Sequence, residues 1–189
     1  MSTTNIMIVG VGGQGTLLAS RILGSAVIRE GYDVKVSEVH GMSQRGGSVV
    51  TYVKYGDKVH SPIIDKGEAD IILAFEQLEA YRALPWLKKG GKMIVNDQKI
   101  NPMPVITGAA EYPDGIIEEL SSKADVTSLD ALKLALEAGS AKAVNVVLIG
   151  VMAKNTSIPF ENWIETVREC VPPKFLEVNL KAFELGYNA

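Results

Sequence analysis

Hydrophobic and polar positions follow two different periods along the first forty residues. Residues 5–9 form a short apolar run closed by glycines, and residues 16–30 repeat apolar side chains at the spacing of an α-helix. Gly31 is a typical helix end, and the alternation over residues 32–39 predicts a second strand. A strand, a helix and a strand in this order favour a parallel sheet with a right-handed crossover.

The next apolar runs predict that the sheet is not purely parallel. Residues 47–55 and 58–61 flank Gly56-Asp57, a two-residue turn typical of antiparallel hairpins. Beyond this predicted hairpin the α/β alternation resumes. A buried strand is predicted at residues 70–75, a helix at 76–87 that stops at Gly90-Gly91, and another strand at 92–96.

The second half of the chain is predicted to be mainly helical. Residues 97–113 contain three prolines, which favour a loop with at most one short strand. Ser128 is expected to cap a helix and Gly186 to end the last one. Apolar spacing predicts helices at residues 114–122, 128–138, 143–154, 160–170 and 174–185.

No repeat, low-complexity tract or linker divides the chain, so residues 1–189 are predicted to form a single domain. The order of elements predicts an α/β fold, a Rossmann-like three-layer sandwich. Its sheet is expected to be mostly parallel and partly mixed, since it includes an antiparallel hairpin.

Composition excludes several classes of function. The formal net charge is −3 with no run of like charges, which argues against nucleic-acid binding. The apolar run at residues 6–9 is too brief for a secretory or membrane segment, so we expect a cytoplasmic protein. The single cysteine, Cys170, supplies neither an internal disulfide nor the thiolates of an iron–sulfur cluster.

The first segment with candidate chemistry is the glycine turn after the first predicted strand. Glycines at this turn let the backbone approach a phosphate, and the helix that follows offers free amides at its N-terminus. The candidate phosphate- or ligand-binding residues here are Gly10, Gly12, Gly13, Gln14 and Gly15. Glu38 stands near the acidic position of dinucleotide-binding proteins, which keeps a nicotinamide or flavin enzyme open. Alternatively, the glycines only permit a tight turn and close packing.

The second segment is residues 37–48, at the carboxyl end of the second predicted strand, where open α/β sheets bind ligands. Arg45 is suited to grip a phosphate or carboxylate with its bidentate fork, or to form a contact with a partner chain. The candidate ligand-binding residues of this segment are Ser43, Gln44, Arg45, Gly46 and Gly47.

His40, in the same segment, is a weak candidate for a proton donor. A half-buried histidine bonded to the backbone is the more ordinary interpretation. Because two glycine-rich loops follow two adjacent predicted strands, we expect them to face one crevice. We predict no metal site in this chain.

Several motifs together resemble the gamma-type domain of 2-oxoacid:ferredoxin oxidoreductases. The likeness spans nearly the whole chain, and the long motif at residues 37–48 resembles the indolepyruvate-type beta subunits in particular. The segments that carry it are Val9–Gly15, Ser37–Ser48, Glu68–Asp70, Leu73–Glu76 and the closing Asn179-x-x-Ala-Phe-x-x-Gly186.

This resemblance implies a complex that oxidatively decarboxylates 2-oxoacids, such as indolepyruvate, to acyl-CoA and passes electrons to ferredoxin. Such a complex uses thiamine diphosphate, Mg²⁺, iron–sulfur clusters and CoA. The chain lacks the thiamine diphosphate signature, so these cofactors are expected on a large partner subunit, and the chain alone is expected to bind none and to be inactive. An isolated copy is expected to be capable of forming a homodimer through the surface meant for that partner.

The two glycine-rich loops are then expected to form one wall of a shared active site, holding an anionic group of CoA, substrate or the partner's cofactor. Two alternatives stay open. One is a stand-alone NAD- or flavin-binding oxidoreductase. The other is a non-catalytic scaffold subunit.

Overall fold

The computed structural model describes residues 3–41 and 46–189, and it is built around one six-stranded sheet. The strands lie in the order β2-β3-β1-β4-β5-β6. Their bounds are β1 Thr4–Val11, β2 Asp33–His40, β3 Ser48–Gly56, β4 Ala69–Ala74, β5 Leu87–Asn96 and β6 Asp125–Leu129.

The sheet is mixed, as the sequence predicted. β1, β4, β5 and β6 run parallel, whereas β3 is antiparallel to both of its neighbours, β1 and β2. The carboxyl ends of the four parallel strands therefore meet at one edge of the sheet, the edge at which α/β proteins bind ligands.

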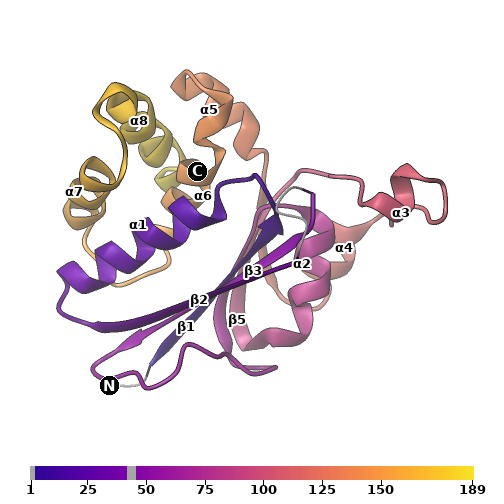
Figure 1. The fold of residues 1–189 in the computed structure, drawn as a ribbon, viewed down its shortest axis with the longest axis horizontal. Helices are drawn as coiled ribbons and strands as arrows, with labels where there is room; N and C mark the ends of the chain where they lie inside the picture. The colour runs from indigo at the N-terminus through magenta and orange to yellow at the C-terminus, as the bar shows by residue number, and fades with distance from the viewer. Residues whose placement is uncertain (1–2, 42–45) are drawn as a thin grey trace.

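Helices cover both faces of the sheet, giving three layers (Figure 1). The α-helices are α1 Thr16–Arg29, α2 Gln77–Ala83, α3 Met103–Ile106, α4 Ile116–Ser121, α5 Ala131–Ala138, α6 Val144–Ala153, α7 Phe160–Cys170 and α8 Leu176–Tyr187. Short 3₁₀ turns are η1 Leu84–Trp86, η2 Ala141–Ala143 and η3 Pro173–Phe175. Within the described ranges, no helix is long and apolar enough to cross a membrane.

Two hydrophobic cores follow from the alternation of side chains along β1. Ile6 and Ile8 point to the face covered by α1, α6, α7 and α8, and Met7 and Val9 point to the face covered by α2 and α4. All four side chains are buried, so β1 is the centre of the molecule. The glycine turn that follows β1 is thus held by a rigid strand.

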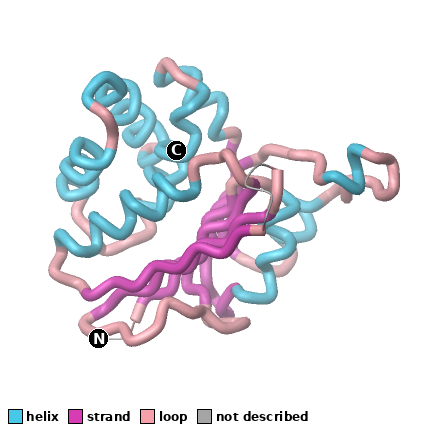
Figure 2. Tube along the Cα trace, viewed as in Figure 1, coloured by secondary structure: helices cyan, strands magenta, loops and turns pink. Residues whose placement is uncertain are grey.

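The antiparallel hairpin is formed by β2 and β3, not by β3 and residues 58–61. β2 pairs with β3 from Asp33↔Gly56 to His40↔Val49, and the chain after Gly56 has no strand before β4. The prediction of a hairpin around Gly56-Asp57 was wrong because turn chemistry marks where a strand ends without naming the strand it pairs with. Figure 2 shows the long loop that follows β3.

Other boundaries were also misplaced. Residues 125–129 form strand β6, so Ser128 lies in a strand and Asp130 caps α5 through a bond from Lys133 N of 2.9 Å. α2 ends at Ala83 in a 3₁₀ turn, and Gly90-Gly91 lies inside β5. Gly186 lies inside α8, which runs on to Tyr187. Residues 97–113 hold helix α3 and no strand.

Candidate functional site

The two glycine-rich loops lie against each other at the carboxyl edge of the sheet. Gly12 N donates to Gly47 O at 2.8 Å, and Gly46 N donates to Gly12 O at 3.3 Å. The prediction that the two strands before these loops are adjacent was wrong, because β3 lies between β1 and β2, but the loops themselves are in contact. Ser43, Gln44 and Arg45 fall outside the described residues, and their assignments stay predictions.

Backbone conformation explains two glycines of the first turn. Gly13 and Gly15 have φ of 102° and 84°, values that residues with a side chain rarely adopt. A Cβ on Gly15 would also lie 2.6 Å from Asn145 Nδ2, the amide that donates to Gly15 O at 3.3 Å. Gly15 is the residue before α1, whose first backbone bond is Ala19 N to Gly15 O. The amides of residues 16–18 therefore have no acceptor within the helix.

Two hollows flank this glycine turn, and both are lined by Gly13 and Gly15. The first has a volume of about 390 Å³ and includes Glu38 and His40. The second, about 450 Å³, includes Lys142. The first residues of α1, Thr16 and Leu17, line the first hollow, whereas the cation Lys142 lines the second beside Gly13 and Gly15. Each hollow thus has one feature that favours an anionic group.

Lys142 was missed by the sequence analysis. It lies in η2, just before α6, and within the described ranges its ammonium group has no ion-pair partner. The one signal in the sequence was its neighbour Asn145, an amide within the otherwise apolar run of α6 that is only 5% exposed. A buried polar residue in an apolar helix indicates a specific contact, here with Gly15.

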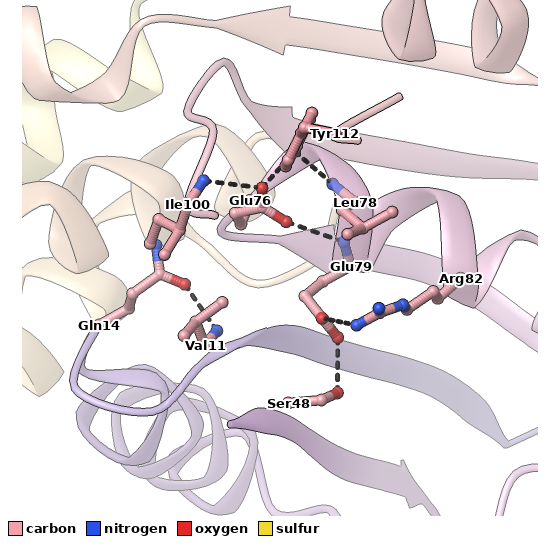
Figure 3. Close-up of polar contacts among 9 residues, drawn as sticks. All are labelled: Val11, Gln14, Ser48, Glu76, Leu78, Glu79, Arg82, Ile100 and Tyr112. Carbon is pink, nitrogen blue, oxygen red and sulfur yellow. Dashed lines mark hydrogen bonds and ion pairs between the residues drawn. The ribbon is translucent and has the colours of Figure 1, made fainter. Parts of the chain in front are cut away.

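Gln14 belongs to the turn but its side chain is directed into the protein (Figure 3). Its Oε1 accepts from Val11 N at 2.7 Å, and its Nε2 donates to Phe75 O at 3.0 Å and to Gln98 Oε1 at 3.3 Å. Gly10 lies within β1, where a Cβ would come 2.9 Å from Gln14 Oε1. These two candidates hold the turn on the sheet, and the mainchain of Gly12, Gly13 and Gly15 faces the hollows.

His40 ends β2 with an exposed ring whose Nδ1 donates to Gly41 O at 3.0 Å. The bond matches the interpretation of a backbone-bonded histidine, but the predicted half-burial was wrong because the ring, at the end of β2, is exposed. Glu38 accepts from Thr51 Oγ1 at 3.3 Å. Dinucleotide binding of the Rossmann type requires the acidic residue on the strand next to the one that precedes the glycine turn. Glu38 does not meet this requirement, because β3 separates its strand β2 from β1.

A second polar centre, buried behind the glycine turn, begins with Glu76 (Figure 3). Its carboxylate, 1% exposed, follows β4 and caps α2 by accepting from Glu79 N at 3.0 Å. The other oxygen accepts from Ile100 N at 3.0 Å and from the Tyr112 hydroxyl. Burial and this hydrogen bond to Glu76 raise the pKa of Tyr112 well above its usual value, so the hydroxyl keeps its proton.

Glu79, one turn along α2, connects this centre to the second glycine loop. Its carboxylate, 5% exposed, accepts from Ser48 Oγ at 2.5 Å and from Arg82 Nη1 at 2.6 Å. Ser48 directly follows Gly47, so α2 holds the described end of the Arg-Gly-Gly loop. Glu76 was visible in sequence only as the last residue of the segment Leu73–Glu76, and its position just after a buried strand was the physical signal. Glu79, which lies within α2, was missed.

The comparisons with known proteins agree with this architecture. The family model described as pyruvate ferredoxin/flavodoxin oxidoreductase matches residues 5–189. The chain is 46% identical to the indolepyruvate oxidoreductase subunit IorB of Pyrococcus horikoshii over 196 aligned positions, covering 100% of this chain and 96% of that protein.

Solved structures show the same fold. The gamma subunit of a keto/oxoacid ferredoxin oxidoreductase from Geobacter sulfurreducens superposes with a TM-score of 0.74 at 26% identity, covering 98% of this chain and 96% of that chain. The 2-oxoglutarate:ferredoxin oxidoreductase of Magnetococcus marinus gives a TM-score of 0.74 at 17% identity and covers 100% of this chain but 31% of that chain. The fold thus also occurs as part of a longer polypeptide.

Proposed function

Since the chain belongs to the pyruvate ferredoxin/flavodoxin oxidoreductase family, we propose that it is the small subunit of an indolepyruvate:ferredoxin oxidoreductase. That complex converts aryl 2-oxoacids and CoA to acyl-CoA, with ferredoxin as electron acceptor. The observation that carries the proposal is the 46% identity to an indolepyruvate oxidoreductase subunit over the whole chain. Glu38 lines one hollow with the glycine turn, but its strand β2 is separated from β1 by β3, and this strand order argues against the alternative of a stand-alone dinucleotide enzyme of the Rossmann type.

The residues present do not fit the electron-transfer cofactors of such a complex. An iron–sulfur cluster takes four thiolates, whereas Cys170 is the single cysteine and lies buried beside Ser25. We therefore assign the clusters to the larger subunit, and the thiamine diphosphate as well because the chain lacks its signature.

The share of this chain is a wall of the active site that binds an anionic group. The main chain of Gly13 and Gly15 and the side chain of Lys142 line the second hollow, and a phosphate or carboxylate there gains hydrogen bonds from backbone amides and the charge of the lysine. The group belongs to CoA, to the oxoacid or to the partner's cofactor. Arg45 is proposed to assist from the neighbouring loop.

Reconstitution with the larger subunit tests the proposed function. We expect indolepyruvate- and CoA-dependent reduction of a one-electron acceptor only when both chains are present. Activity of the larger subunit alone at the full rate would make this chain a scaffold at most. NAD-dependent turnover by this chain alone would replace the proposal with the dehydrogenase alternative.

Replacement of Lys142 identifies the bound group. A hydrogen bond to a charged group contributes about 1.5–3 kcal/mol, and Lys142 is exposed, so Lys142→Ala is expected to raise one Michaelis constant about 10-fold with kcat nearly unchanged. The substrate or cofactor whose constant rises is the one bound here. Lys133→Ala, another exposed lysine, serves as the matched control. Unchanged constants for CoA, oxoacid and thiamine diphosphate would contradict the assignment.

A further inference from the structure

Residues 100–112 form an arm that projects from the body of the protein, with α3 near its tip (Figure 1, Figure 2). The arm has an internal structure of its own. Ile106 N donates to Pro102 O at 3.0 Å, Thr107 N to Met103 O at 2.9 Å, and Ala109 N and Ala110 N to Pro104 O at 2.8 and 3.0 Å. These bonds give the tip one defined conformation although it extends into solvent.

The tip of the arm is apolar. From Ile100 to Ala110 the sequence has no charged residue. Met103 and Ile106, which begin and end α3, are each 65% exposed. A projecting loop of a monomer normally carries polar side chains, so large exposed apolar ones at its end mark a surface that another molecule covers.

The two ends of the arm are both hydrogen-bonded to one buried carboxylate, that of Glu76. Glu76 accepts from Ile100 N at the start of the arm and from the Tyr112 hydroxyl at its end. The Lys99 ammonium adds an ion pair to Asp114 at 3.5 Å and lies 5.5 Å from the centre of the Tyr112 ring. With its two ends fixed and its tip already folded, the arm loses little conformational entropy when it docks.

The position of the arm identifies what it docks into. It starts two residues after Gln98, whose side chain bonds Gln14 and which lines the second hollow. A protein that grips the arm is therefore brought to the glycine turn. We propose that the arm inserts into an uncharged, apolar pocket of the larger subunit. That pocket lies beside the second hollow, at the place where the larger subunit completes the shared active site. This inference rests on the proposed function and adds the surface by which the complex assembles.

The arm variant Met103→Asp/Ile106→Asp tests the docking. Both side chains are exposed in the isolated chain, so its thermal unfolding is expected to match wild type. Each apolar anchor is expected to contribute more than about 1 kcal/mol of binding free energy, and the variant loses both. Its dissociation constant for the larger subunit, measured by biolayer interferometry, is therefore expected to be at least about 30-fold higher than that of wild type. Ile28→Asp, at a 60% exposed position on α1, is the matched control and should bind within about 3-fold of wild type.

Each other outcome counts against the docking proposal in a recognisable way. An arm variant that binds the larger subunit as tightly as wild type overturns it while the reconstituted activity still supports the proposed function. Equal weakening by Ile28→Asp also overturns it. If the arm variant instead turns a homodimer of the isolated chain into a monomer and leaves the larger subunit bound, a second copy is the occupant. A wild-type chain that binds no larger subunit removes the proposed function itself.

Discussion

Gly186→Ala is expected to destabilise the chain by about 4 kcal/mol or more, a large part of the 5–15 kcal/mol typical of a domain. α6 and α8 touch backbone to backbone at this point. A Cβ on Gly186 would lie 2.0 Å from Val147 O and 2.8 Å from Val147 C, and one on Gly150 would lie 2.2 Å from Phe183 O. No change of rotamer relieves a clash with backbone, so the helices must separate and open the larger core.

Urea unfolding monitored by circular dichroism measures this loss. Gly24→Ala is the control, because Gly24 lies in α1 and an added Cβ would meet only Val36 Cγ2 at 4.0 Å. That change is expected to stabilise the protein by about 0.5–1 kcal/mol, the ordinary effect of alanine in a helix. A Gly186→Ala protein within 1 kcal/mol of wild type would show that the two helices are not held at this distance.

The fold was predictable wherever hydrophobic periodicity was long and uninterrupted. α1 and α7 were located to within a residue because their apolar positions recur over several turns. β6 was missed because it is a short edge strand of five residues, none of them buried, so its alternation is weak. Gly186 was predicted to end a helix because the sequence does not reveal that the neighbouring helix leaves no room for a side chain at this position.

The candidate site was predictable only in its local part. The glycine turn and the Arg-Gly-Gly loop are continuous motifs, and their chemistry follows from neighbouring residues. Lys142 lines a hollow with the turn only through the packing of α6 on α1, and Tyr112 reaches Glu76 only because the arm returns to α2. Contacts between distant segments depend on the tertiary structure, which no local pattern encodes.

The remaining large effect is expected at Glu76. Glu76→Ala leaves the Tyr112 hydroxyl and the amides of Glu79 and Ile100 without their acceptor. Unpaired buried groups cost about 1–3 kcal/mol each, and part of this is recovered by water that enters the new space, so we expect a loss of about 3 kcal/mol in the free energy of unfolding. Hydrogen exchange at Ile100 should accelerate with it, because its amide loses its acceptor.

A double-mutant cycle with Tyr112→Phe separates the contact between Glu76 and Tyr112 from general damage to α2. If the hydroxyl acts through Glu76, the two losses are not additive, and a coupling of about 1 kcal/mol or more is expected. Tyr81→Phe is the matched control, since its hydroxyl donates at 3.0 Å to Glu119, a carboxylate that Lys123 also holds at the surface. Strict additivity of Glu76→Ala and Tyr112→Phe would mean that the arm is held by its other contacts. If the two substitutions are coupled and Glu76→Ala also binds the larger subunit more weakly, the buried carboxylate of Glu76 holds the arm in the position in which the larger subunit binds it.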